Sequence, residues 1–220
     1  MTHDLVLIDY GAGNMRSVVK AFAHLGYAPH VTSEPGDVVE ARALVLPGVG
    51  AAGQIMRSLR ELELDGAIKE YIASGKPFLG VCMGMQVLME WSDEDGGQPC
   101  LRVFEGAVRR FDVPYKVPHM GWNAVSQRIP HPLWAGIPDE SYFYFVHSYA
   151  VATAPAIQAG VTDYGGLFPS ALARDNIFGT QFHPEKSGSV GLRLYRNFVE
   201  WALDADVAGV AGASTQGGGS

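Results

Sequence analysis

The sequence has few of the features that indicate an exported, membrane-bound or nucleic-acid-binding protein. Only two of its 220 residues are cysteines, Cys82 and Cys100, so no disulfide is expected and a reducing cytoplasm is the expected compartment. The formal net charge is −7, which leaves no basic surface for nucleic acid. The apolar runs are too short to span a membrane, and the N-terminal segment around Asp4 lacks the charged leader of a secretory signal. These absences favour a cytoplasmic globular protein with a free thiol.

The first half of the sequence alternates short apolar runs with amphipathic helical patterns. Because this alternation is typical of parallel βαβ units, an α/β fold with a mainly parallel central sheet is predicted. Beyond a polar loop at 92–99 the pattern changes to strands and turns, which we expect to extend the sheet in antiparallel fashion. Strands are predicted at about 5–8, 27–32, 43–46 and 77–81, and helices at about 14–25, 52–62, 66–73, 83–91 and 189–203.

The chain is predicted to form one domain. Hydrophobic residues make up 47% of it, which is enough for a sizeable core, and no repeat or linker divides it. From residue 207 the composition changes to alanine, glycine, serine and threonine, which is typical of a disordered tail. We therefore predict a single domain over residues 1–206 and a tail over 207–220.

Cys82 lies between two glycines at the end of a predicted strand. The segment Gly80-Val81-Cys82-Met83-Gly84 has the pattern of a nucleophile elbow, in which a tight strand-to-helix turn exposes the nucleophile. A helix N-terminus then favours the thiolate. A free cysteine is alternatively a small buried apolar residue, but the flanking glycines favour the elbow. Cys100, beside the polar loop, has no such setting and receives no role.

A thiol that attacks a carboxamide needs an imidazole to accept its proton. His183 follows the apolar run 177–182 and precedes Pro184-Glu185, where the proline holds the chain extended. Residues two apart then point the same way, so the Glu185 carboxylate can orient the His183 ring. The alternative is a strand-end histidine beside a surface glutamate. His119 and His147 remain possible neighbours of the site.

Several backbone and amide groups are candidates for the rest of the site. The Met83 N–H, directly after the nucleophile, can meet an oxyanion, and a second donor can come from Pro47-Gly48-Val49-Gly50, which is otherwise an ordinary turn. Gln86 lies four residues after Cys82 on the predicted helix, so it can reach a bound ligand unless it is a solvated surface residue. The histidines and cysteines show no metal-ligand spacing, and neither a metal nor a cofactor is expected.

These motifs resemble those of the class I glutamine amidotransferases. The resemblance rests on the elbow segment 80–86 and the segment 181–187, and it is strengthened by DYGAGN, LPGVGAA, PHMGWN and YFVHSY at 9–14, 46–52, 118–123 and 144–149. It spans nearly the whole chain. Methionine at position 83, where leucine is common, is a small departure that leaves the backbone N–H in place. The resemblance implies the three-layer, flavodoxin-like fold of this family.

The resemblance also implies a reaction and its residues. Cys82 would attack the side-chain amide of glutamine to give a glutamyl thioester and ammonia, with His183 as base and acid and Glu185 as its orienting group. Water would then release glutamate. Gln86, with the backbone around Ser148 and Tyr149, would hold the substrate. The peptide between Gly48 and Val49 would be the oxyanion donor that turns inward when a partner binds its nucleotide.

The partner implied by the resemblance is a β/α-barrel cyclase that forms a heterodimer with this chain. Ammonia would pass to it, and it would make imidazole glycerol phosphate and aminoimidazole carboxamide ribonucleotide in histidine biosynthesis. Matching motif positions give the candidate interface residues, which are Asn14, Met120, Trp122, Tyr144 and Lys186. Trp122 could equally be a core residue.

Two other interpretations remain open. One is a different class I glutaminase or a γ-glutamyl hydrolase, against which the segments 9–14 and 118–123 argue. The other is a catalytically silent interaction subunit, against which the intact set of Cys82, His183 and Glu185 argues.

Overall fold

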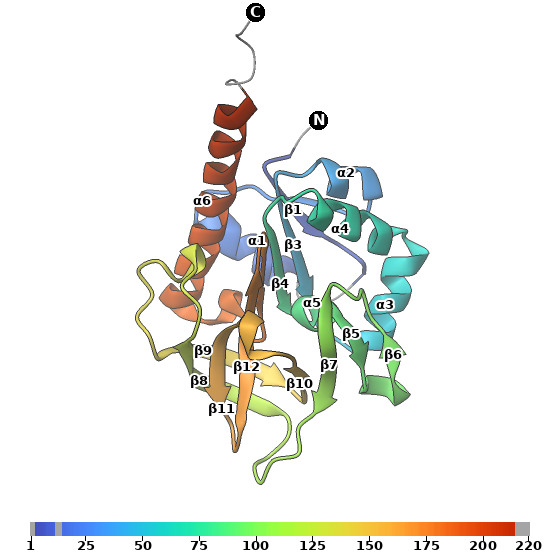
Figure 1. Cartoon of the computed structure of the whole chain (residues 1–220), viewed down its shortest axis with the longest axis vertical. Helices are drawn as coiled ribbons and strands as arrows, with labels where there is room; N and C mark the ends of the chain where they lie inside the picture. The colour runs from blue at the N-terminus through green and yellow to red at the C-terminus, as the bar shows by residue number, and fades with distance from the viewer. Residues whose placement is uncertain (1–2, 12–14, 214–220) are drawn as a thin grey trace, which may run out of the picture.

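The computed structural model describes residues 3–11 and 15–213, with the backbone alone for 204–213. Strands in these residues form two sheets (Figure 1). Their bounds are β1 Leu5–Ile8, β2 His30–Thr32, β3 Ala43–Gly48, β4 Phe78–Cys82, β5 Met89–Ser92, β6 Gln98–Pro99, β7 Phe104–Arg110, β8 His119–Gln127, β9 Ser141–His147, β10 Tyr149–Ala152, β11 Gln158–Asp163, β12 Leu167–Arg174 and β13 Ile177–Thr180.

The larger sheet combines a parallel half with an antiparallel half. Its nine strands follow the order β2-β1-β3-β4-β13-β12-β11-β8-β9. Strands β2 to β13 in this order pair in parallel, whereas β12, β11, β8 and β9 pair antiparallel. The predicted parallel sheet with an antiparallel extension is therefore confirmed. A second sheet of four strands, β10-β7-β5-β6, was not predicted.

Helices cover both sides of the parallel strands. Figure 1 shows α1 and α6 on one side of β1, β3 and β4 and α2, α3 and α4 on the other, which gives the three predicted layers. The helix bounds are α1 Met15–His24, α2 Pro35–Glu40, α3 Ala52–Glu61, α4 Leu64–Ala73, α5 Met83–Gln86 and α6 Gly188–Ala213, with short 3₁₀ helices η1 Glu94–Gly96, η2 Pro132–Trp134, η3 Pro155–Ile157 and η4 Pro184–Lys186.

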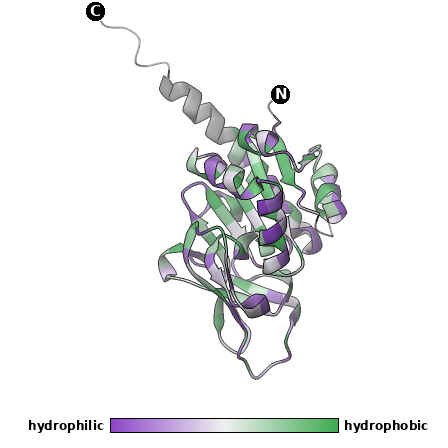
Figure 2. Ribbon diagram, turned by 90° about the vertical axis from the view of Figure 1, so that its right-hand side faces the viewer, coloured by the Kyte–Doolittle hydropathy of each residue, from purple (hydrophilic) through white to green (hydrophobic). Residues whose placement is uncertain are grey.

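The core lies between these layers. Every residue of β1, β3 and β4 is buried, because helices cover both faces of a parallel sheet and leave no strand face to solvent. In Figure 2 the strands inside the molecule carry much of the green of hydrophobic residues, while the helices around them are coloured partly purple. The apolar runs that predicted the strands are therefore the same residues that build the core.

The helix predicted at 83–91 is wrong in its second half. Helix α5 ends at Gln86, and Met89–Ser92 forms strand β5, which pairs in parallel with β7 through Met89 and Phe104. Residues 85–89 are all buried, so they do not form the single apolar face of a surface helix. Pairing with the second sheet decides the conformation here. Helix α2, which opens with Pro35 in its first turn, was also not predicted.

The last helix is longer than the pattern at 189–203 predicts. Helix α6 runs to Ala213, so it overlaps the segment from residue 207 that is predicted as a tail. Residues 214–220 lie outside the described part of the chain.

Strands β8 and β9 form an antiparallel ribbon at one edge of the larger sheet. Trp122 pairs with Tyr144 and Met120 with Val146, and alternate side chains along each strand point to opposite faces. The inward face of β9 carries Phe143, Phe145 and His147. The outward face carries large side chains that are exposed: Met120 by 62%, Trp122 by 54% and Tyr142 by 60%. We call this outward face the β8–β9 surface.

Candidate active site

Three neighbouring parallel strands bring the candidate residues to one edge of the sheet. Strand β3 ends at Gly48, which pairs with Cys82 at the end of β4, and β13 leads directly into the segment that contains His183. The carboxyl ends of parallel strands meet at the same edge, where ligands bind in open α/β sheets. Chain topology thus places Cys82 between the glycine-rich loop and His183.

The backbone at Cys82 has the strained geometry of a nucleophile elbow. Its φ of 54° and ψ of −108° lie outside the regions that non-glycine residues favour. Both flanking glycines are required by close packing. A Cβ at Gly80 would lie 2.7 Å from the Gly84 carbonyl oxygen, and one at Gly84 would lie 1.8 Å from the Leu46 carbonyl oxygen. The two glycines therefore allow α5 to pack directly on strands β3 and β4.

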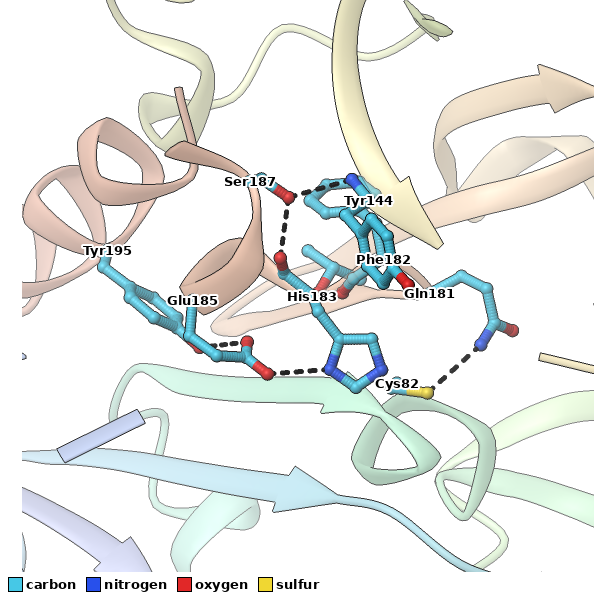
Figure 3. Close-up of polar contacts among 9 residues, drawn as sticks. Cys82, Tyr144, Gln181, Phe182, His183, Glu185, Ser187 and Tyr195 are labelled. Atoms are coloured by element: carbon cyan, nitrogen blue, oxygen red, sulfur yellow. Dashed lines mark hydrogen bonds and ion pairs between the residues drawn. The ribbon is translucent and has the colours of Figure 1, made fainter. Parts of the chain in front are cut away.

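His183 and Glu185 form a buried ion pair. The His183 Nδ1 lies 2.8 Å from the Glu185 Oε1, and their side chains are 2% and 1% exposed. The hydroxyl of Tyr195, on α6, donates a 3.2 Å hydrogen bond to the other carboxylate oxygen. Burial alone raises the pKa of Glu185, but the hydrogen bond and charge of His183 outweigh it and lower that pKa. Glu185 is thus held as a carboxylate that fixes the ring (Figure 3).

The second nitrogen of the His183 ring is directed toward the Cys82 sulfur in Figure 3. This Nε2 is buried and makes no hydrogen bond to the described residues that meets normal geometry. Burial would lower the pKa of His183, but the negative charges of Cys82 and Glu185 and their hydrogen bonds raise it to about 10. At neutral pH the ring is therefore a cation next to the Cys82 sulfur.

The backbone of His183 is fixed from strand β9. The His183 N–H donates a 2.9 Å hydrogen bond to the Tyr144 carbonyl, and the Tyr144 N–H donates a 3.0 Å bond to the Ser187 hydroxyl. That hydroxyl in turn donates a 2.6 Å bond to the His183 carbonyl. The position of the imidazole therefore depends on the ribbon whose outward face is the β8–β9 surface.

A cavity of about 410 Å³ opens beside the Cys82 sulfur. Its volume suits a small molecule of amino-acid size. Gly48 does not line this cavity, but a Cβ there would lie 2.6 Å from the Met83 Cβ, so the loop packs tightly on α5. The cavity lining includes Val49, Gly50, Cys82, Met83, Gln86, Glu94, Ser148, Tyr149 and His183.

Gln86 is a buried residue of the cavity wall and not a solvated surface residue. Its side chain is 1% exposed, and its Nε2 donates hydrogen bonds to the Tyr149 carbonyl at 2.9 Å and to the Gln181 Oε1 at 2.8 Å. Its own Oε1 is buried without a partner among the described residues. Because such an acceptor is costly to leave unpaired, it suits a ligand that brings an N–H group.

Sequence reasoning did not identify three residues of this site. Glu94, assigned to a polar loop, places a carboxylate on the cavity wall. Gln181 donates to the Cys82 sulfur at 3.7 Å. Tyr195 lies on α6 and received no role. His147, predicted as a possible neighbour of the site, does line the cavity, whereas His119 is not among the cavity-lining residues. Gln181 is the first residue of the motif at 181–187, which is the one local signal that could have found it.

The candidate interface residues occupy the β8–β9 surface and its border. Met120 and Trp122 are exposed, so Trp122 is not a core residue. The Trp122 ring lies edge-on to Tyr144 at 6.1 Å, and the Lys186 ammonium lies 5.9 Å from the centre of the Tyr144 ring. Asn14 lies outside the described residues.

Potential metal ligands come together at one place in the described residues, His3, His30 and Asp37, and none of them lines the cavity. The two imidazole rings are stacked 3.8 Å apart and nearly parallel, and His30 Nε2 already bonds the Asp37 carboxylate at 2.9 Å. Parallel rings direct their nitrogen lone pairs side by side, which is poor geometry for one ion.

None of the helices in the described residues is long and apolar enough to cross a membrane.

Comparison with protein families assigns this chain to a known class. Residues 6–201 match the family described as glutamine amidotransferase class-I. The chain belongs to the class-I glutamine amidotransferases.

Relatives in this family share about half of the sequence. One from Herpetosiphon aurantiacus, named imidazole glycerol phosphate synthase subunit HisH, is 52% identical over 200 residues, which cover 90% of this chain and 95% of the relative. Proteins of the same name from Desulfitobacterium hafniense and Dehalococcoides mccartyi are 50% and 48% identical, over 89% and 90% of this chain and 93% and 98% of their own lengths.

Solved structures share the fold at much lower identity. A structure described as a glutamine amidotransferase superposes with a TM-score of 0.72 at 20% identity and covers 90% of this chain and 99% of its own. PurLQS from Thermotoga maritima gives a TM-score of 0.71 at 14% identity, with coverage of 91% and 99%. These likenesses support the predicted fold class.

Proposed function

We propose that this chain is the glutaminase subunit of an imidazole glycerol phosphate synthase in histidine biosynthesis. The observation that carries the proposal is the identity of about half of all residues to subunits of that name over nine tenths of the chain. The glutaminase domain would span residues 1–206. A cytoplasmic location belongs to the same proposal and is consistent with two free cysteines.

In the proposed reaction, the sulfur of Cys82 attacks the side-chain carboxamide carbon of glutamine. The protonated His183 ring, held in place by Glu185, lies beside the sulfur and balances its charge. Attack converts the carbonyl oxygen to an oxyanion, for which the backbone N–H groups of Val49 and Met83, two residues that line the cavity, are the proposed donors. Gly48 would permit the loop to change orientation because it carries no side chain.

Collapse of this intermediate releases ammonia. The C–N bond breaks while His183 transfers its proton to the departing nitrogen, which leaves a glutamyl thioester on Cys82. The neutral ring can then accept a proton from water as the water attacks the thioester carbon. The C–S bond breaks, glutamate leaves, and the ring is protonated again. Each proton thus passes through the Nε2 that makes no normal hydrogen bond to the described residues.

Gln86, Ser148 and Tyr149 are proposed to hold the amino-acid end of glutamine. All three line the cavity, and the unpaired Gln86 Oε1 offers an acceptor for the α-ammonium group. Glu94 lines the same cavity and carries a carboxylate, which complements the positive charge of that group.

The proposed partner is a β/α-barrel cyclase that docks on the β8–β9 surface. Met120 and Trp122 are large exposed side chains on the same face of the ribbon, and aromatic residues and methionine are enriched at the centre of interfaces. Tyr144, Lys186 and Asn14 are proposed to join it. Ammonia would leave the cavity toward this partner.

The decisive experiment compares the two cysteines. Cys82→Ala and Cys100→Ala each remove one buried thiol, but only Cys82 lies at the cavity. We expect Cys82→Ala to abolish glutamate release from glutamine, measured with and without the cyclase and its nucleotide, and to leave the complex assembled in size-exclusion chromatography. Cys100→Ala is expected to retain activity. Glutamine-dependent activity in Cys82→Ala would refute the assignment, and no activity in the unmodified chain under either condition would indicate a silent subunit.

A further inference from the structure

A continuous set of buried and partly buried hydrogen bonds connects strand β8 to the sulfur of Cys82. It runs from Asn123 through His119 and His147 to the Tyr149 carbonyl, and from there through Gln86 and Gln181 to Cys82. His119, His147, Gln86 and Gln181 are each at most 6% exposed. We call these groups the buried network. Neither the proposed reaction nor substrate binding requires its full length.

The polarity of its inner half follows from one carbonyl. The Tyr149 oxygen can only accept, so the Gln86 group that contacts it at 2.9 Å is the amide NH₂. The other hydrogen of that NH₂ points at Gln181, 2.8 Å away, so the Gln181 atom there is the oxygen. The remaining end of Gln181 is then an NH₂ group, and it lies 3.7 Å from the Cys82 sulfur. Gln181 is thus oriented to donate to sulfur.

The polarity of the outer half agrees with this. The Asn123 amide is fixed because its oxygen accepts from the Ala124 N–H and its NH₂ donates to the Asp163 carbonyl, both at 2.9 Å. Its second hydrogen points at the His119 Nε2, which must accept. His119 therefore carries its proton on Nδ1 and donates to the His147 Nε2 at 3.1 Å. His147 then carries its proton on Nδ1 and donates to the Tyr149 carbonyl at 2.8 Å.

This arrangement holds for two neutral histidines. A proton added to the His147 Nε2 would face the Nδ1–H of His119, and a change of tautomer at His119 would place an N–H against the Asn123 NH₂. Burial lowers the pKa of His147 to about 3 and that of His119 to about 4, which agrees with the neutral pair. The Tyr149 carbonyl therefore receives two donors, one from His147 and one from Gln86.

We propose that Gln181 stabilises the Cys82 thiolate by donating its amide N–H to the sulfur, and that His147 is a positioning residue that fixes the direction of this bond through the Tyr149 carbonyl and Gln86. The inference rests on the proposed function for its catalytic meaning. Its chemistry, however, can be tested on the chain alone.

The test of the first part is the pH dependence of alkylation of Cys82. Only a thiolate reacts rapidly with iodoacetamide, so the rate against pH, followed at Cys82 by mass spectrometry in the full-length chain, reports thiolate formation. Gln181→Glu keeps size and the acceptor for Gln86 but replaces the donor with a carboxylate. We expect the midpoint of its curve to move at least one pH unit upward. Alkylation at neutral pH would then be about tenfold slower.

Gln181→Met, which is neutral and of similar length, is the second variant. It keeps the test informative if the Gln181→Glu variant does not fold. It is expected to move the midpoint in the same direction by less. The other titratable groups near the sulfur, His183 and Tyr10, and Glu94 on the cavity wall remain unchanged in both variants. An unshifted curve in either folded variant overturns the proposal, whether or not glutamine is hydrolysed.

A matched pair at His147 tests the positioning role. In His147→Asn the side-chain NH₂ takes the place of Nδ1–H and can still donate to the Tyr149 carbonyl, whereas in His147→Gln it takes the place of Nε2 and cannot. We expect His147→Gln to raise the KM for glutamine at least fivefold and His147→Asn to stay close to the unmodified value. Equal effects of the two variants would contradict the role. A normal alkylation curve for the unmodified chain, together with no glutaminase activity, would instead count against the proposed function.

Discussion

Cys82 and Cys100 are the same residue type in opposite chemical settings. Burial, more than any charge, raises the pKa of the Cys100 thiol to about 11, so that side chain behaves as a small apolar residue. Cys82 is also buried, but it is accompanied by the His183 cation and the Gln181 amide and lies at a cavity. The difference between a reactive and an inert thiol thus depends on neighbours that the fold supplies.

His131 provides a prediction for the pH dependence of stability. Burial lowers its pKa to about 4, below the value of about 6.5 expected in the unfolded chain. Between these values the unfolded state binds more protons, so the free energy of unfolding falls as pH decreases from about 6.5 toward 4. Because the ring is only partly buried, we expect its share of the loss between pH 7 and pH 5 to be about 1 kcal/mol.

His131→Asn isolates this contribution. Asparagine keeps an acceptor for the Leu133 N–H that His131 now receives at 3.2 Å, but it does not titrate. Loss of ring contacts with Phe178 and Trp201 will lower stability at every pH, so the informative quantity is the difference between urea unfolding at pH 7 and at pH 5. That difference should be smaller in the variant. Equal differences in both proteins would show that His131 does not titrate with a lowered pKa.

At this scale, the sequence predicts residues whose roles are visible within one segment. Cys82 between glycines and the pair His183 and Glu185 are local patterns, and the structure brings these three together. Gln181 and Tyr195 could not be assigned from pattern alone. Their partners, Cys82 and Glu185, are fixed by the pairing of β13 with β4 and by the docking of α6, which are tertiary events.

The elbow joins strand β4 to helix α5 at a contact that only glycine allows. We expect Gly84→Ala to lower the free energy of unfolding by about 2 kcal/mol or more, since its Cβ would overlap the Leu46 carbonyl oxygen and push α5 away from β3. The matched control is Gly66→Ala in α4, where nothing lies within 4 Å of the added Cβ. This control should be more stable by about 0.5 kcal/mol, because alanine favours the helix.

Urea unfolding of the two variants checks this element-scale prediction, with the alkylation rate of Cys82 as a local readout. Gly84→Ala should lose stability and alter that rate. Gly66→Ala should be slightly more stable than the unmodified chain and should leave the alkylation rate unchanged. If both variants were equally stable, α5 could move away from β3 without cost and the glycine would have no packing role.

Strands and helices were predictable from the sequence where the spacing of apolar residues matches the burial pattern of the element. Strands β1, β3 and β4 are buried on both faces and read as continuous apolar runs, so their position was evident. Residues 83–91 read as a helix because apolar residues recur there, but Met89–Ser92 pairs with β7 instead. A short apolar run does not distinguish a buried strand from a helix, and only the distant partner strand decides.

At the scale of the whole molecule, the β8–β9 ribbon links the exposed surface to the candidate site in two ways. Tyr144 holds the backbone of His183 through its N–H and carbonyl groups, directly and through Ser187. On the inward face, His119 pairs with His147 within the buried network. A partner that docks on the outward face would therefore contact the same strands that position the imidazole and the cavity wall.

Trp122 gives the prediction for this surface. It is 54% exposed, lies edge-on to Tyr144 and has no role in the cavity, so its truncation should affect docking and not chemistry. We expect Trp122→Ala to weaken binding of the barrel cyclase by about 2 kcal/mol, roughly 30-fold in Kd, as aromatic residues at the centre of interfaces do. Leu167→Ala is the control, because Leu167 is 70% exposed but lies on β12 outside the ribbon.

Isothermal titration calorimetry with the cyclase measures both variants, and the alkylation rate of Cys82 in the isolated chain should be unchanged in each. A loss of affinity in Leu167→Ala with none in Trp122→Ala would place the partner on a different face.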